Sequence, residues 1–276
     1  MAQKVIWITG ASSGFGYALA EILAQKGHIV YAGARRIEAM EPLKKAGVIP
    51  HHLDVTNESS IRKAFDQIQH EQGRIDILYN NAGYGTYGPV DVDDLKDIQA
   101  MFEVNLFGAA RVNHVVLPQM ISQRSGRIIL TASLVSHLST PGIGWYAATK
   151  HALNAMVKAL RMEVKEFNVD VIQIEPGSVK TGFRDIALES IRSQSYNQNY
   201  QPLMLDFEHY IEQTYAHSPN MRSTLKAMER AGFESKPHWV YRTTHDAKLL
   251  PVVQKVLGLK LSSKVILRTI RRKYKK

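Results

Sequence analysis

A glycine-rich segment near the N-terminus constrains the fold of this chain more than any other stretch. The sequence TGASSGFG at 9–16 directly follows an apolar run over 5–8 and directly precedes a helical pattern over 17–26. This order predicts a strand, a tight turn and a helix. Glycines let the backbone approach a pyrophosphate, and the free N–H groups at a helix N-terminus attract it. The alternative is that the glycines serve only to make a turn.

The rest of the chain alternates short β-type runs with amphipathic helical stretches, a pattern typical of βαβ units around a parallel sheet. The pattern predicts an α/β fold with a Rossmann-type doubly wound parallel sheet in a single domain. Candidate N-caps are Ser59 or Ser60 and Asp93 or Asp94. The expected strands are 4–8, 29–34, 49–53, 75–80, 126–131, 169–175 and one near 238–243, and the expected helices are 14–26, 38–46, 59–71, 95–123, 146–167, 219–231 and 247–257.

We expect a dinucleotide-binding catalytic domain over 1–254 and a basic C-terminal tail over 255–276. The βα rhythm breaks between 182 and 246, which predicts a helical lid that binds the substrate. Within it, the polar residues and Pro202 around 195–202 indicate a long loop.

The composition excludes several classes of protein. The chain has no cysteine, which excludes disulfides, thiolate catalysis and zinc-thiolate sites. We see neither a secretory signal nor a run long enough to span a membrane, so we expect a cytoplasmic protein. The net charge of +10 comes almost entirely from residues 255–276, which hold nine lysines and arginines and no acid. We therefore expect no nucleic-acid partner.

The basic tail permits two interpretations. Ile266, Ile270 and Tyr274 recur every four residues among cations, which could form an amphipathic helix with weak affinity for an anionic membrane surface. Alternatively, these apolar residues pack on the body or on a partner subunit while the lysines stay in water.

Tyr146 and Lys150 lie four positions apart, hence on one face of one helix. A neighbouring cation favours the phenolate form of a tyrosine, so the pair could act as an acid or a base. Such pairs also occur by chance on solvated helices. Ser133 adds a hydroxyl at the end of a predicted strand, where ligands bind in doubly wound sheets.

Together with the glycine loop, these residues resemble the short-chain dehydrogenase/reductase family, in its compact, NADP-preferring branch. The resemblance covers about residues 4–182. The ordered motifs that carry it are Thr9-Gly10-x-x-x-Gly14-x-Gly16, Asp54-Val55, Asn80-Asn81-Ala82-Gly83, Asn105, Ser133, Tyr146-x-x-x-Lys150, and Pro176-Gly177 with Thr181.

The resemblance implies that Tyr146 exchanges a proton with the substrate oxygen and that Ser133 holds this oxygen. Lys150 would lower the pKa of Tyr146 and bind the nicotinamide ribose, and Asn105 would order a water that relays the proton. Thr181 would bind the carboxamide of the nicotinamide. Asp54 and Val55 would contact the adenine, and Asn81 would contact the ribose region on the adenine side. The full expected cofactor set is Gly10, Ser12, Ser13, Gly14, Phe15, Gly16, Arg35, Arg36, Asp54, Val55, Asn81, Ala82, Gly83, Tyr146, Lys150, Pro176, Gly177, Val179 and Thr181.

The end of the second strand indicates the cofactor. NAD-binding relatives carry an acid there, whereas this chain has Ala34 followed by Arg35 and Arg36. Because an arginine pair suits a 2′-phosphate, we expect NADP(H) rather than NAD(H). The alternative is that both arginines only form a solvated turn.

The expected activity is the interconversion of a hydrophobic ketone or aldehyde, such as a steroid, retinoid or lipid carbonyl, with its alcohol. The competing hypothesis is a catalytically idle dinucleotide-binding sensor or scaffold. We expect no metal, because His51, His52, His114, His137 and His151 lack ligand spacing, and we expect a homodimer or homotetramer from the resemblance. The expected substrate wall is Tyr84, Tyr87, Leu134, Val135, Leu138, Trp145, Phe183, Ile186, Met204, Leu205 and Tyr210.

Overall fold

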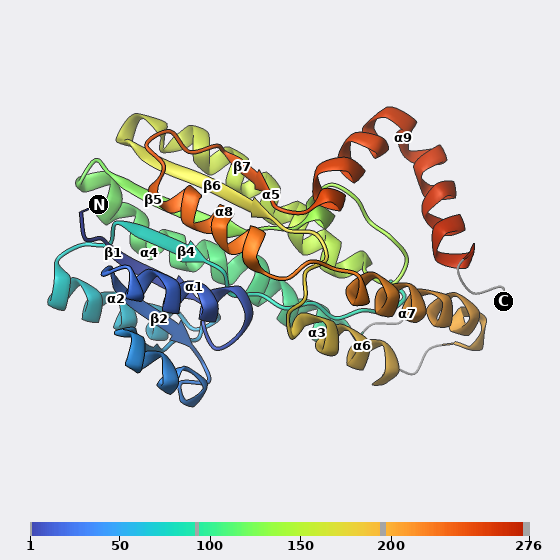
Figure 1. The fold of residues 1–276 in the computed structure, drawn as a ribbon, viewed down its shortest axis with the longest axis horizontal. Helices are drawn as coiled ribbons and strands as arrows, with labels where there is room; N and C mark the ends of the chain where they lie inside the picture. The colour runs from blue at the N-terminus through green and yellow to red at the C-terminus, as the bar shows by residue number, and fades with distance from the viewer. Residues whose placement is uncertain (1, 92–93, 194–196, 273–276) are drawn as a thin grey trace.

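A seven-stranded parallel sheet forms the centre of the computed structural model, which describes residues 2–91, 94–193 and 197–272 (Figure 1). The strand order is β3-β2-β1-β4-β5-β6-β7. After β3 the chain returns to the middle of the sheet, where β4 lies beside β1, and β5 to β7 extend toward the other edge. The doubly wound Rossmann-type fold predicted above is thereby confirmed. The strands are β1 Val5–Thr9, β2 Ile29–Ala34, β3 Ile49–His52, β4 Ile77–Asn80, β5 Gly126–Thr131, β6 Val169–Glu175 and β7 Val240–Arg242.

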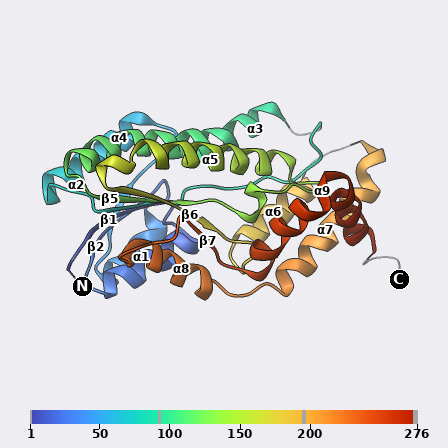
Figure 2. The ribbon, with the colours of Figure 1, turned by 90° about the horizontal axis from the view of Figure 1, so that it is seen from above.

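Helices cover both faces of this sheet, as the view in Figure 2 shows. One layer contains α2 Glu58–Gln72, α4 Ala109–Ser122 and α5 Gly144–Glu163, and the other contains α1 Gly14–Gln25 and α8 Arg222–Phe233. In β1, Val5 and Trp7 pack into the core under the first layer, while Ile6 and Ile8 pack into the core under the second. Because both faces are buried, β1 reads as a continuous apolar run.

A third group of helices caps the carboxyl end of the sheet (Figure 1). It consists of α6 Phe183–Ser193, α7 Gln201–Ala216 and α9 His245–Arg272. A separate apolar cluster holds this cap together, with Phe207 and Ile270 among its buried residues. The helix α9 bends sharply at Gly258, whose φ of 67° lies in the region that favours glycine.

The segment 182–246 is largely helical, as expected of a helical lid, and α8 matches the helix expected over 219–231. The long loop expected around 195–202 needs correction: a 3₁₀ turn, Gln198–Tyr200, leads into α7, which begins at Gln201, and residues 194–196 lie outside the described chain. Pro202 stands in the first turn of α7, where its missing N–H costs nothing. The helix expected over 247–257 matches the part of α9 before the bend at Gly258, and a second helical part, which was not predicted, continues to Arg272.

Three local predictions need correction. The helix expected over 95–123 is α3 Leu95–Phe102, a π-helical turn Glu103–Gly108 and then α4. The segment Glu38–Ala46 is a 3₁₀ helix with Pro42 inside it. Asn57, not Ser59 or Ser60, caps α2, because its side chain accepts a hydrogen bond from the N–H of Ser60. Asp94 caps α3 as expected, and Asp93 lies outside the described residues.

Further short 3₁₀ turns occur at Leu134–Ser136 after β5 and at Lys165–Phe167 before β6. The first of them follows Ser133 directly and so shapes the site described below. Among the described helices, none combines the length and the apolar character that a membrane span requires.

Candidate active site

One large cavity runs along the carboxyl ends of the strands. Its volume is about 970 Å³, and its walls extend from the glycine loop, past Ser133 and Tyr146, to a space between α7 and α9. Of the predicted catalytic and cofactor residues, Gly16 and Asn105 do not line it. Those that do are Gly10, Ser12, Ser13, Gly14, Phe15, Arg35, Arg36, Asp54, Val55, Asn81, Ala82, Gly83, Ser133, Tyr146, Lys150, Pro176, Gly177, Val179 and Thr181.

Two glycines of the loop, Gly14 and Gly16, have different structural roles. Gly14 has φ +58°, and a Cβ there would meet open space, so the loop leaves room for a ligand at this point. Gly16 permits close packing instead, because its Cβ would lie 2.6 Å from the carbonyl oxygen of Gly10. The loop therefore offers the bare backbone that a pyrophosphate requires, with Gly16 as a support.

Hydrogen bonds join the ends of β1, β4 and β5 to the catalytic helix. The hydroxyl of Thr9 accepts from the backbone N–H groups of Asn81 and Ala82, at 3.0 Å each. Asn81 Nδ2 donates to the carbonyls of Thr9 and Gly10, and Thr131 Oγ1 donates to Asn81 Oδ1. Lys150 Nζ donates to the carbonyl of Thr131 at 2.9 Å. The glycine loop and Lys150 are thus parts of one network.

Ser133 lies at the start of a 3₁₀ turn that fixes its position. Its Oγ accepts from the N–H of Val135, and its own N–H donates to Ser136 Oγ, at 3.3 Å each. The N–H of Leu134 donates to the carbonyl of Pro176 at 2.8 Å, which ties the turn to the end of β6. The Ser133 hydroxyl keeps its own proton available for a further partner.

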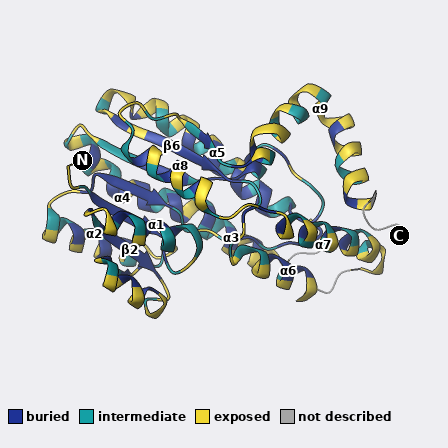
Figure 3. Cartoon of the chain, in the orientation of Figure 1, coloured by how far each residue is buried: buried dark blue, intermediate teal, exposed yellow. Residues whose placement is uncertain are grey.

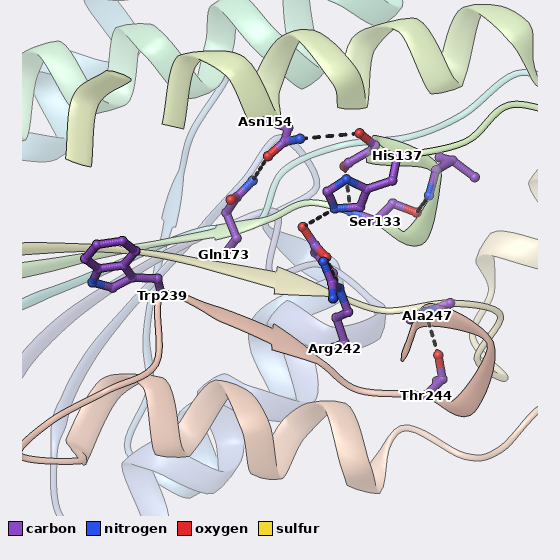
Figure 4. Close-up of polar contacts among 12 residues, drawn as sticks. Ser133, His137, Asn154, Gln173, Trp239, Arg242, Thr244 and Ala247 are labelled. Carbon is purple, nitrogen blue, oxygen red and sulfur yellow. Dashed lines mark hydrogen bonds and ion pairs between the residues drawn. The ribbon is translucent and has the colours of Figure 1, made fainter. Parts of the chain in front are cut away.

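A buried carboxylate supports this turn through His137, which Figure 4 shows near Ser133 and Arg242. Glu175 at the end of β6 is 1% exposed and accepts from His137 Nε2 at 2.8 Å and from Arg242 Nε at 3.0 Å. His137 directly follows the 3₁₀ turn, and Arg242 ends β7. Sequence reasoning did not find this cluster, since its members are distant in the chain.

Tyr146 is buried among aromatic side chains at the centre of the cavity. Its ring centroid lies 5.5 Å from that of Phe183 and 6.1 Å from that of Tyr87. Burial raises the pKa of Tyr146, the nearby Tyr215 raises it further, and a hydrogen bond with Ser133 opposes this effect. The net increase means that the phenol keeps its proton at neutral pH.

Lys150 lies one turn further along α5. Its Nζ is 5.9 Å from the centroid of the Tyr146 ring, and burial lowers the pKa of Lys150 to about 8. Burial of Tyr146 raises the pKa of its phenol. This effect opposes the decrease in the Tyr146 pKa that the charge of Lys150 was expected to cause.

Asn105 lies within the π-helical turn and is 1% exposed. Its Oδ1 accepts from the N–H of Tyr84 at 2.9 Å, and its Nδ2 donates to the Tyr84 carbonyl and to Thr149 Oγ1. These contacts give Asn105 a positioning role between α5 and the segment after β4. The water relay expected of it stays a prediction.

The cofactor-side mouth of the cavity is cationic. Arg35 and Arg36 are both exposed and line the cavity, and Arg36 donates to the Ser12 hydroxyl at 3.3 Å. Burial acts to raise the pKa of Asp54, but hydrogen bonds from Thr56 and the charge of Arg35 outweigh it and lower the pKa. The Asp54 carboxylate is thus held by Thr56.

The opposite end of the cavity is lined mainly by apolar and aromatic residues. Of the predicted substrate wall, Tyr84, Tyr87, Leu134, Val135, Leu138, Phe183, Ile186 and Tyr210 line it. Trp145 instead donates to the carbonyl of Val90, Met204 is buried in the cap, and Leu205 is exposed. The sequence reasoning missed the walls supplied by α7 and α9, which are Phe207, Ile211, Thr214, Tyr215, Leu250, Val253, Gln254, Leu257, Ser262, Val265, Ile266, Thr269 and Ile270.

Ile266 and Ile270, in the predicted basic tail, pack on the cap. This arrangement supports the interpretation in which the tail packs on the body. Tyr274 lies outside the described residues. Asp246, at the start of the same helix, accepts from the N–H of Ser178 and so holds the loop after β6. Within the described residues, no group of three or more His, Asp and Glu side chains is arranged to bind a metal.

Comparison with known proteins gives a consistent result. The chain is 39% identical over 185 residues to a 3-ketodihydrosphingosine reductase of Bacteroides thetaiotaomicron, covering 67% of each chain. It is 34% identical to an NADPH-dependent 1-acyldihydroxyacetone phosphate reductase of Schizosaccharomyces pombe over 218 residues, or 76% of this chain and 73% of that one. A short chain dehydrogenase/reductase from Burkholderia phymatum, solved in complex with NAD, superposes with a TM-score of 0.81 at 25% identity, covering 92% and 94% of the two chains. Residues 4–190 match the short chain dehydrogenase family, and the chain belongs to this family of oxidoreductases.

Proposed function

We propose that the protein is an NADP(H)-dependent oxidoreductase that interconverts a hydrophobic ketone or aldehyde and its alcohol. The observation that carries this proposal is one continuous cavity, which joins the glycine loop and two arginines to Ser133, Tyr146 and Lys150 and then to an apolar end. A cofactor and a hydrophobic substrate could therefore meet at Tyr146.

The residues around Tyr146 suit proton transfer to a carbonyl oxygen. When bound, the nicotinamide supplies or accepts the hydride. Because burial keeps the Tyr146 phenol protonated, its hydroxyl can donate a proton to the substrate oxygen during reduction. The Ser133 hydroxyl orients that oxygen. With a pKa of about 8, Lys150 is largely charged at neutral pH and stabilises the phenolate that remains.

The preference for NADP(H) rests on Arg35 and Arg36. Both line the cavity mouth, and β2 ends in Ala34 without an acid that could accept a bond from a ribose 2′-hydroxyl. The Asp54 carboxylate is already engaged by Thr56. The name of the NADPH-dependent relative supports the same choice, whereas the Burkholderia phymatum structure holds NAD.

The apolar walls support a steroid, retinoid or lipid-like substrate. Phe183, Phe207 and Tyr210 surround the space beyond Tyr146, and α9 extends it with aliphatic side chains. The names of the two relatives compared above favour a lipid carbonyl among these classes.

An assay of NADPH and NADH oxidation against aliphatic, aromatic, steroid and retinoid carbonyls tests this proposal. We expect NADPH consumption with apolar ketones or aldehydes, and weaker activity with small polar ones. The competing function is a catalytically idle dinucleotide sensor. It would be favoured if the protein bound NADPH but oxidised it with none of these carbonyls.

A further inference from the structure

The outer side of α9 is unusually apolar for an exposed helix. Seven of the fourteen large hydrophobic residues exposed in the described chain lie on α9. Val256, Leu259 and Leu249 are the most exposed of them, at 78%, 74% and 60%. Figure 3 shows α9 as a largely exposed arch that projects from the body. Such a concentration on one element indicates a binding surface rather than scattered surface residues.

Most of these residues lie away from the side of α9 that packs on the body, while Leu250 and Val265 also line the cavity. Leu249, Val252 and Val256 follow helical spacing and share one face before the bend at Gly258. Ala247, by contrast, is buried on the inner side. After the bend, Leu261 and Val265 form a second exposed pair, whereas Ile266 and Ile270 pack inward. The α9 outer surface therefore comprises Leu249, Val252, Val256, Leu259, Leu261 and Val265.

Cations flank this surface along its whole length. The exposed residues Lys248, Lys255, Lys260, Lys264, Arg268 and Arg271 all lie on α9, and the last four share one face after the bend. The single acid in the sequence of α9 is Asp246, which is engaged with the backbone of Ser178. An apolar strip beside lysines and arginines matches the two layers of an anionic membrane surface, acyl chains beneath charged headgroups.

The cavity opens beside the same surface. Leu250 and Val265 are exposed and also line the cavity, so its apolar end reaches the outside at α9. A second copy of the chain would suit this surface poorly, because two such helices would bring like charges together.

We propose that the α9 outer surface docks on an anionic phospholipid membrane, and that a lipid carbonyl passes from the bilayer into the cavity beside α9. The docking step stands by itself, while the passage of substrate rests on the proposed function. The sequence alone suggested Ile266 and Ile270 as the membrane-facing residues. The structure assigns this role to the opposite side of the helix.

Co-sedimentation with vesicles tests the docking step. The full chain is mixed with vesicles of phosphatidylcholine alone or with one third phosphatidylglycerol, at low salt and at 0.5 M NaCl. We expect binding to the anionic vesicles that salt weakens. A Leu249→Ser/Val256→Ser/Leu259→Ser variant should lose roughly 10-fold or more in affinity, since apolar burial and charge are both needed for stable binding. The matched control is Leu95→Ser/Met162→Ser, at exposed apolar positions away from α9.

A second variant tests whether the lysines of α9 contribute to vesicle binding, and a matched control shows whether removing any three exposed lysines has the same effect. Lys255→Gln/Lys260→Gln/Lys264→Gln should also weaken anionic-vesicle binding, whereas Lys63→Gln/Lys158→Gln/Lys226→Gln, exposed on other helices, should not. The proposal is overturned if the wild type does not bind anionic vesicles, if the α9 variants bind like their controls, or if the wild type self-associates through α9 and the first variant abolishes this association.

The passage of substrate has its own readout. The α9 variants should reduce a water-soluble carbonyl at the wild-type rate but a vesicle-embedded long-chain ketone more slowly. Equal loss on both substrates would contradict entry from the bilayer. If no carbonyl is reduced at all, the proposed function fails while the vesicle result still decides docking.

Discussion

The two ends of the cavity are built by different means. At the cofactor end, backbone and short polar side chains from β1, β4 and β5 form a closed network from Thr9 to Lys150. At the substrate end, α6, α7 and α9 pack through apolar side chains, with Phe207 and Ile270 buried between them. Directional hydrogen bonds dominate at the cofactor end. Apolar packing dominates at the substrate end, although Arg192 of α6 also pairs with Glu208 and Glu212 of α7. The cofactor end therefore suits one fixed ligand, whereas substitutions of apolar side chains at the substrate end could change which substrate binds there.

Tyr146 lies where the two ends meet, and its loss should have the largest effect. We expect Tyr146→Phe to lower kcat by about 10²–10⁴-fold, the usual contribution of a positioned proton donor. The Kd for NADPH, measured by fluorescence titration, should change little. Wild-type turnover in this variant would show that Tyr146 does not transfer the proton.

Arg35 tests whether the cofactor end acts independently of the substrate end. Because a hydrogen bond to a charged group contributes about 1.5–3 kcal/mol, Arg35→Glu should raise the KM for NADPH by about 10–100-fold. The KM for NADH and for the carbonyl should hardly change. Arg62→Glu, on the exposed side of α2, serves as the control. An unaltered preference for NADPH would remove Arg35 from the cofactor site.

Glu175 tests the support beneath Ser133. Glu175→Gln removes the charge that His137 and Arg242 share, and the turn that holds Ser133 should lose its fixed position. Because catalysis depends on close positioning, a displaced Ser133 hydroxyl should lower kcat by about 10-fold or more. The KM for NADPH should stay the same, and Glu175→Asp should recover part of the rate. Asp170→Asn, on the exposed part of the same strand, is the matched control. Equal losses in both variants would indicate a general loss of stability.

Lys150 should give the smallest effect, on stability rather than on rate. Its pKa is about 8 in the folded chain and near 10.5 when unfolded, so between these values the unfolded state binds more protons. The buried charge destabilises the fold below pH 8, and stability recovers as pH rises. From pH 8 to pH 9 the wild type should gain about 1 kcal/mol in unfolding free energy relative to Lys150→Met. Urea unfolding at both pH values measures this, and a difference that does not change with pH would contradict it.

The same contrast explains which features could be predicted from the sequence. The strand ends carry local signals, such as glycines before a helix or Tyr146 four residues before Lys150, so the cofactor end was predictable. The cap was predicted only as a helical lid, and α7 was missed, because Pro202 and its polar neighbours suggest a loop while tertiary packing makes this segment a helix. Glu175, Asp246 and Tyr215 acquire their roles through residues far away in the chain. The oligomeric state and the cytoplasmic location stay predictions.

The transfer of a labelled hydride tests the central claim most directly. The protein is incubated with NADPH that carries deuterium at nicotinamide C4 and with an apolar ketone from the panel, and the product is examined by mass spectrometry. We predict an alcohol that carries one deuterium on the former carbonyl carbon, formed by the wild type and almost absent with Tyr146→Phe. Tight NADPH binding without any labelled alcohol, across the whole carbonyl panel, would contradict the account.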